Sequence, residues 1–281
     1  MGNCGDPAIL RTLRGWGPGN LAMAVGAVLR GRRRSLAADA ARILPAFQPP
    51  PVIEGRENIP ARQAFVLVVN HFQAPGLWVG MVALAITRAV AEARAPGGQE
   101  LHWLGLADWR WLEFRGRWLP NPLSAVVFPR ALRVWGCVPT PSDPADVAGR
   151  VRALRQILGY LGRRGRGAAA EPQPVAIFPE GTGTIALQEA RPGSGAFVQR
   201  LSNHGFPVLP LGQYQGPDGR IVIRFGRPFH LGEPPPESDL TLDDWARQRM
   251  MGRVGALLPR ELWGVYAAAA ERGLAEQTGA P

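Results

Sequence analysis

Two short apolar runs, each ending in polar residues at a turn, constrain the fold of this chain most strongly. "AFVLVVN" covers residues 64–70, and "PVAIFPEG" covers residues 174–181. Both are continuous and rich in Val, Ile or Phe, which is typical of strands buried on both faces of a parallel sheet. Because both faces of such a sheet must be covered, the pattern requires helices on each side.

Segments of helical length alternate with these runs. Helices are predicted at 77–93, at 143–164 after an Asp suited to cap it, and around 194–204. Shorter strands are predicted in "ELHWLGL", "LRVWGCVP" and "FPVLPLGQY", with a hairpin in "GRIVIRFGRPF" and a Trp-rich helix around 108–118. The alternation predicts an α/β fold, an αβα sandwich around a central, largely parallel mixed sheet, with helical N- and C-terminal additions.

The chain has 281 residues, 46% of them hydrophobic, enough for one large core. The Pro-rich connector "FQPPPVIEG" suggests a boundary. We therefore expect a helical N-terminal segment at 1–48, an α/β domain at 52–230, and a Pro-rich loop with helices at 231–281.

The net charge of +10 is carried entirely by Arg, since the sequence contains no Lys. A compositional bias explains this, and so does an anionic partner such as phospholipid headgroups, a phosphorylated substrate or nucleic acid. The first 48 residues hold an apolar run followed by Arg30, Arg32, Arg33 and Arg34. Such a segment suits a membrane interface with its arginines at phosphate level, or a peripheral helix with a solvated basic end.

Tryptophans are concentrated in one part of the chain, at positions 103, 109, 111, 118 and 135, interleaved with Arg. They suit either an interfacial belt or a helix that packs its aromatics inward. Single-stranded nucleic acid is a third option, but no nucleic-acid motif accompanies the pattern, so no such partner is expected. The predicted partners are a membrane surface, through the Arg-rich and Trp-rich segments, and a lipid acceptor.

Cysteine content, the N-terminal sequence and hydropathy indicate the expected cellular location. Cys4 and Cys137 form neither a disulfide framework nor a metal-ligand spacing, so no metal site is predicted. The N-terminus lacks a secretory pattern and the Ser or Thr at position 6 that N-myristoylation requires. No run of 18 apolar residues occurs. We expect a cytoplasmic protein peripheral to the inner face of the membrane.

Polar residues follow both buried runs directly: Asn70 and His71 after the first, Glu180, Gly181 and Thr182 after the second. In open α/β sheets, ligand sites gather beyond the carboxyl ends of the strands. The two turns are therefore predicted to share a site.

Several segments, in order, resemble the glycerophospholipid acyltransferase family, which includes lysophosphatidic acid acyltransferases. "VIEGRENIP" and "FVLVVNH" resemble the lead-in strand and the His-x-x-x-x-Asp block of that family. "IFPEGTGT" is similar to its Phe-Pro-Glu-Gly-Thr-Arg block. "GSGAFVQRLSNHGFPVLPLG" and "GRIVIRFGRPF" resemble the segments that follow, and the resemblance covers roughly residues 52–230.

The resemblance implies that a fatty acyl group moves from acyl-CoA or acyl carrier protein, as co-substrate, to a hydroxyl of a lipid-like acceptor. The reaction requires a base, donors for the developing oxyanion and a pocket for the acceptor. His71 matches the family's catalytic base. The predicted substrate contacts are Asn70, Glu180, Gly181 and Thr182. The alternative is a catalytically inactive relative that binds lipid or membrane.

Three positions depart from the family pattern. Gly76 stands in place of the Asp and Gly183 in place of the Arg, and in "GCVPTPSD" the position of a second-block arginine falls on or near Ser142. A water, a backbone carbonyl or a distant acid such as Asp108 is a candidate orienter for His71. The candidates to replace the missing arginines from neighbouring loops are Arg130, Arg133, Arg150 and Arg191. Two inferences stay open, an acceptor other than glycerol phosphate or a loss of catalysis. His102, His204 and His230 are expected to be structural or exposed.

Overall fold

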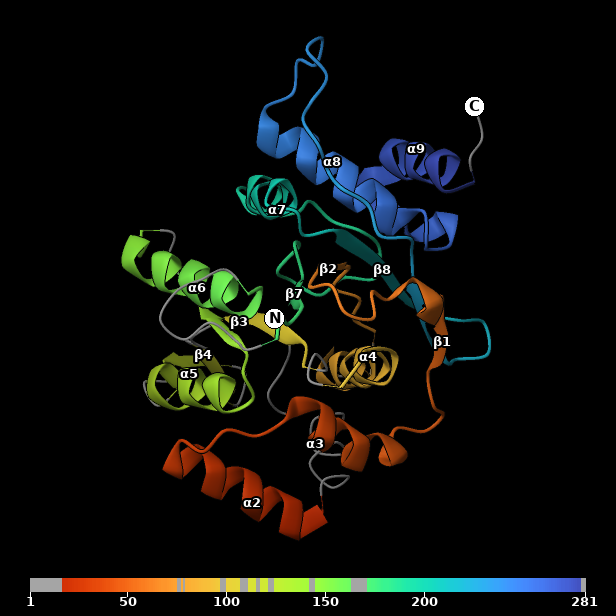
Figure 1. The fold of residues 1–281 in the computed structure, drawn as a ribbon. Coiled ribbons are helices and arrows are strands. Elements are labelled where there is room, and N and C mark those ends of the chain that lie inside the picture. The colour runs from red at the N-terminus through yellow and green to blue at the C-terminus, as the bar shows by residue number, and fades with distance from the viewer. Residues whose placement is uncertain are drawn as a thin grey trace.

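A central seven-stranded sheet organises the chain, with helices on both of its faces (Figure 1). The computed structural model describes residues 17–74, 77, 79–96, 100–106, 111–114, 117–120, 124–141, 145–162 and 171–278. The strand order is β1-β9-β8-β2-β7-β3-β6. The strands are β1 (Val52–Glu54), β2 (Val66–Val69), β3 (His102–Leu106), β6 (Val138–Thr140), β7 (Val175–Ile177), β8 (Val208–Gln215) and β9 (Ile221–Phe225).

The sheet is mixed but largely parallel, as predicted. β2 lies at its centre and pairs in parallel with β7 on one side, Val68 opposite Ile177, and with β8 on the other. β3 and β6 continue the parallel arrangement beyond β7. β9 is antiparallel to β8, which confirms the hairpin, and β1 runs parallel to β9 at the sheet edge.

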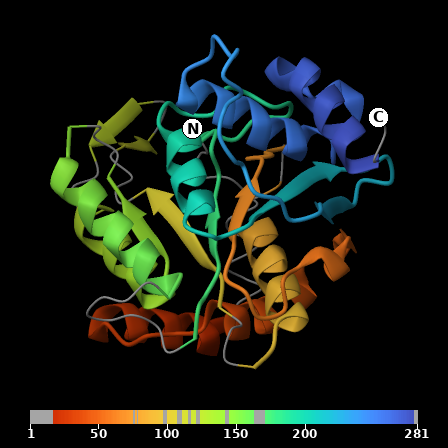
Figure 2. The same ribbon diagram turned by 45° about the horizontal axis from the view of Figure 1, so that its top comes forward.

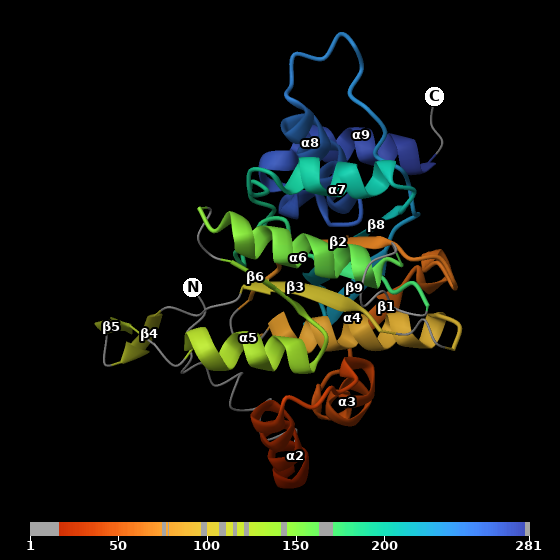
Figure 3. The ribbon, with the colours of Figure 1, turned by 60° about the vertical axis from the view of Figure 1, so that its left-hand side comes forward.

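The side chains of β2 alternate between two apolar layers. Leu67 and Val69 contribute to the layer beneath α4 (Val79–Ala93) and α5 (Ser124–Val134). Val66 and Val68 contribute to the opposite layer, with α6 (Val147–Tyr160), α7 (Ser194–Asn203) and α8 (Leu242–Gly255). Figures 2 and 3 show these helices above and below the sheet. All four strand residues are fully buried, which explains why the run lacks polar positions.

The described part of the N-terminal segment, from residue 17 on, contains the helices α2 (Gly17–Arg30) and α3 (Leu36–Ile43), which lie outside the α4 layer (Figure 3). Ser35 caps α3 by accepting a hydrogen bond from the Ala38 N–H at 3.0 Å. Ile43 of α3 packs with Met81 and Leu84 of α4. In the part of the chain that the structure describes, no helix is long and apolar enough to cross a membrane.

The C-terminal residues share a core with the sheet. Met250, Met251 and Val254 of α8 belong to the same buried layer as Val66 and Val68. α9 (Ala267–Thr278) lies against α8 (Figure 1).

Short 3-10 helices in the described part of the chain cover Leu44–Ala46, Arg56–Asn58, Arg260–Leu262 and Gly264–Tyr266.

The helix predicted around 108–118 is wrong. β4 (Trp111–Phe114) and β5 (Arg117–Pro120) instead form an antiparallel pair separate from the main sheet. Aromatic residues favour extended backbone, which is consistent with strands in place of the predicted helix. Trp103 is buried and donates to the Thr87 hydroxyl at 2.9 Å, so this tryptophan packs inward. Trp109 lies outside the described residues, and an interfacial belt stays a prediction.

Candidate active site

The turns after β2 and β7 meet, as the sequence predicts. The backbone N–H of His71 donates to Glu180 Oε2 at 2.6 Å. The Thr184 N–H donates to the His71 carbonyl at 2.9 Å, and the Gln73 N–H donates to the Thr184 carbonyl at 3.0 Å. Because β2 and β7 are parallel neighbours, their carboxyl ends lie side by side and the two loops continue the pairing beyond the sheet.

Glu180 joins these loops from within. Its side chain is only 5% exposed, and its second oxygen accepts the Gln188 N–H at 2.8 Å. Burial raises the pKa of its carboxyl, and the N–H groups of Gln188 and His71 limit the rise. The sequence predicted that this carboxylate grips an acceptor. The structure corrects this role, since both oxygens face the protein backbone and hold His71 in place.

Asn70 also differs from its predicted role as a substrate contact. It is 3% exposed, its Nδ2 donates to the Gln213 carbonyl at 2.9 Å, and its Oδ1 accepts the Gln213 N–H at 2.8 Å. Gln213 Nε2 donates back to the Asn70 carbonyl at 2.5 Å. The side chain therefore completes the β2–β8 pairing where β2 ends, and its polar atoms are used within the sheet.

Gly181 and Thr182 lie at the outer side of the turn. Gly181 has φ of +64°, and a Cβ there would stand 2.2 Å from Arg191 Nε. Glycine is thus required both by the backbone and by the guanidinium packed against it. Arg191 Nη2 donates to the Gly181 carbonyl at 3.2 Å. Thr182 is exposed, so its hydroxyl is accessible from solvent.

The His71 ring is half-buried beside aromatic residues. It meets Phe178 edge to face, with ring centroids 4.8 Å apart, and Phe178 stacks on Trp103. Burial lowers the pKa of His71; its own backbone carbonyl acts in the opposite direction, and the positive charge of Arg191 lowers it further. The lowered pKa favours the neutral imidazole, the form that a general base requires.

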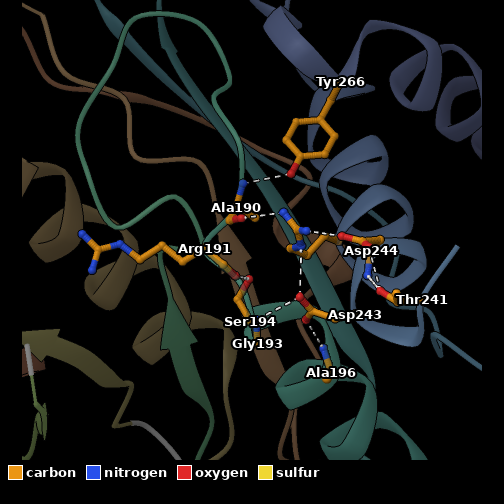
Figure 4. Close-up of polar contacts among 10 residues, drawn as sticks. Ala190, Arg191, Gly193, Ser194, Ala196, Thr241, Asp243, Asp244 and Tyr266 are labelled. Carbon is orange, nitrogen blue, oxygen red and sulfur yellow. Dashed lines mark hydrogen bonds and ion pairs between the residues drawn. The ribbon is translucent and has the colours of Figure 1, made fainter. Parts of the chain in front are cut away.

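The C-terminal helices fix the loop that carries Arg191 (Figure 4). Asp243 of α8 accepts the Gly193 N–H at 2.9 Å and the Ala196 N–H at 2.8 Å, capping α7 from outside. The Ala190 N–H donates to the Tyr266 hydroxyl at 2.9 Å. The Arg191 side chain points away from this network, and its guanidinium reaches Gly181 instead.

Among the four arginines considered as substitutes, Arg191 contacts the candidate site. Arg130 Nε donates to the Val28 carbonyl at 2.6 Å, and Arg133 lines a pocket beside α2, so both belong to the α2–α5 region. Arg150 is exposed on α6. Gly76, Asp108 and Ser142 lie outside the described residues, so the predictions made for them stay predictions.

The remaining histidines are structural or exposed, as expected. His102 stacks on Tyr160 and bonds through Nδ1 to the Gly136 carbonyl at 2.8 Å; burial lowers its pKa to about 4. His204 and His230 are exposed. Within the described ranges, no group of three or more His, Cys, Asp or Glu residues is arranged to hold a metal ion.

Comparisons with known proteins add little to this geometry. No family model matches the sequence, and no curated protein matches it. Among solved structures, the chain is similar to the crystal structure of the 1-acyl-sn-glycerophosphate (LPA) acyltransferase PlsC from Thermotoga maritima. The sequence identity is 20%, the alignment covers 89% of this chain and 97% of that one, and the TM-score is 0.43. A likeness this loose transfers no residue role, so the site rests on its own contacts.

Replacing Arg191 by Gln tests the electrostatics of this site. We expect the pKa of His71 to rise, because a positive charge near the imidazolium is removed while the buried Glu180 stays in place. NMR titration of the ring protons measures the shift. Arg200→Gln, an exposed change on α7, is the matched control and leaves the pKa unchanged. A His71 pKa that stays the same or falls in Arg191→Gln contradicts the assignment.

Proposed function

We propose that this chain is an acyltransferase that moves a fatty acyl group from acyl-CoA or acyl carrier protein to a hydroxyl of a lipid-like acceptor, with His71 as general base. The observation that carries the proposal is the half-buried imidazole at the end of β2, held through its backbone N–H by the buried carboxylate of Glu180. The ordered segments at 52–230 that resemble glycerophospholipid acyltransferases point to the same chemistry.

The reaction has two steps, the attack of the hydroxyl on the thioester and the collapse of the tetrahedral intermediate, and one proton moves in each. His71 Nε2 takes the proton of the acceptor hydroxyl as its oxygen attacks the thioester carbonyl, giving a tetrahedral oxyanion. The intermediate collapses when the carbon–sulfur bond breaks, and the thiolate leaves with the proton returned by the imidazolium. The products are the acyl ester and the free thiol, and His71 is neutral again.

Acceptor recognition is proposed at the outer side of the same turn. Thr182 offers an exposed hydroxyl, and Arg191 offers a guanidinium beside Gly181. A guanidinium binds a phosphate or carboxylate through paired N–H donors, so an acceptor with an anionic group suits this position. Glu180 is assigned a positioning role, since its oxygens accept backbone N–H groups.

Activity measurements on the full chain test the proposal. Wild-type protein is expected to transfer radiolabelled acyl groups from acyl-CoA or acyl carrier protein to at least one hydroxyl acceptor in a lipid panel. Removing the base in His71→Ala should lower the rate by about 10²–10⁴-fold. His204→Ala, at an exposed histidine, is the control and retains the rate.

The alternative is an inactive relative that binds lipid or membrane, which Gly76 and Gly183 favour at the sequence level. Wild-type protein that transfers no acyl group above a protein-free background, while still binding the acceptor lipids, supports this alternative. A rate that exceeds this background but is equal in wild type and His71→Ala removes His71 from the mechanism.

We also propose that the protein works at the inner face of a membrane, where α2 and α5 contact the lipid. Leu29 of α2 is 71% exposed and Val126 of α5 is 69% exposed. A pocket of about 620 Å³ lies beside α5, and it is lined by Arg33 of the segment after α2 and by Arg130 and Arg133 of α5. Exposed apolar side chains around basic groups match the needs of an interface with anionic headgroups.

Vesicle co-sedimentation measures this surface. The chain is expected to bind phosphatidylglycerol vesicles more tightly than phosphatidylcholine vesicles, with a loss of binding at high salt. Val126→Asp should weaken binding about tenfold, because it removes apolar contact and adds a negative charge. Val151→Asp, at an exposed position of α6, is the matched control. Equal binding by the two variants would place the lipid contact elsewhere.

A further inference from the structure

The Nδ1 atom of His71 is buried and has no hydrogen-bond partner among the residues that the structure describes. It faces Gly183. A Cβ on Gly183 would stand 2.7 Å from Nδ1 and only 2.2 Å from Gln73 Oε1. The amide oxygen of Gln73 and the ring nitrogen therefore border the same small space, which exists because position 183 has no side chain.

Backbone pairing holds Gln73 at this space. Its N–H donates to the Thr184 carbonyl at 3.0 Å, and this bond is one of the two that form the parallel bridge between Phe72 and Thr184. Gly183 and Gln73 are thus brought together by the same pairing that joins the His71 and Glu180 turns. This pairing fixes the position of the Gln73 backbone, from which the side chain extends beside Gly183.

An acceptor beside Nδ1 would favour the tautomer of His71 in which Nε2 is free to act as a base. Nε2 accepts a proton only when the ring proton sits on Nδ1, and a buried Nδ1–H needs an acceptor. A side-chain amide fills this role for the imidazole in the Cys-His-Asn arrangement of papain-like proteases, where Asn stands in place of Asp. Gln73 carries the same carboxamide group.

We propose that Gln73 is the positioning residue for His71, its Oε1 accepting the Nδ1–H after a small side-chain rotation into the space over Gly183. The catalytic meaning of this contact rests on the function proposed above. Since a carboxamide is neutral, it fixes the tautomer without adding charge to stabilise the imidazolium. Arg191 and Glu180 are the charged groups that already face the His71 turn from neighbouring loops.

The tautomer of His71 tests this directly and without any activity. Long-range ¹H–¹⁵N NMR on the full chain, assigned with His71→Ala, reports the ratio of the two neutral forms. Wild type is expected to favour the Nδ1–H form, and Gln73→Met should shift the ratio toward Nε2–H by about fivefold, the factor that one ordinary hydrogen bond supplies. Gln63→Met, at an exposed glutamine bonded to the Gly205 carbonyl, is the matched control.

Two further variants address the same contact. Gln73→Glu should raise the pKa of His71 by about one unit or more, because a carboxylate then faces the ring. Gly183→Ala should mimic Gln73→Met, because its Cβ occupies the shared space. An unchanged tautomer ratio in Gln73→Met together with an unchanged pKa in Gln73→Glu overturns the proposal.

Acyl-transfer rates distinguish a failure of this inference from a failure of the proposed function. If Gln73 acts through His71, Gln73→Met lowers kcat more than it raises KM, and Gln73→Glu restores transfer. If Gln73→Met shifts the tautomer ratio but the wild-type protein transfers no acyl group, the Gln73–His71 contact is supported and the proposed acyltransferase function is rejected. Transfer that depends on His71 but is unaffected by Gln73→Met rejects Gln73 alone.

Discussion

The candidate site depends on one buried carboxylate that two backbone N–H groups share. Glu180 accepts the His71 N–H through one oxygen and the Gln188 N–H through the other. Burying a carboxylate is unfavourable unless hydrogen bonds satisfy it, so the group is stable here only while both loops stay in place. The end of β2, the end of β7 and the loop before α7 are thereby tied at one point, and the position of the imidazole follows.

Residues far along the chain complete this arrangement. Asp243 of α8 holds the start of α7, and Tyr266 holds the Ala190 N–H. These contacts fix the loop from which Arg191 reaches the Gly181 turn. Burial of the ring lowers the pKa of His71, and the positive charge of Arg191 lowers it further. The C-terminal helices therefore influence the electrostatics of the site through the position of Arg191, although His71 and Glu180 lie on other segments.

The sequence was sufficient for the sheet and for the meeting of the turns. Short apolar runs rich in Val and Ile that end in turn residues are typical of buried strands, and Val68 and Ile177 are indeed paired in adjacent parallel strands. Side-chain direction was not predictable. Asn70 and Glu180 follow strands in the manner of ligand-binding residues, yet both are turned to backbone groups of neighbouring segments. Nothing in the sequence indicated Gln73, because its place beside His71 depends on the missing Cβ of Gly183 in the turn after β7.

Amide hydrogen exchange in wild type and in Glu180→Ala tests the central role of the carboxylate most directly. We expect the His71 and Gln188 amides to be protected in wild type and to exchange at least about tenfold faster in the variant, while the Val66 amide, bonded to the Pro207 carbonyl in the sheet, keeps its protection. Glu189→Ala, at the exposed neighbour of Gln188, should change none of them. Equal protection of His71 and Gln188 with and without the Glu180 carboxylate would show that this group does not tie the loops together.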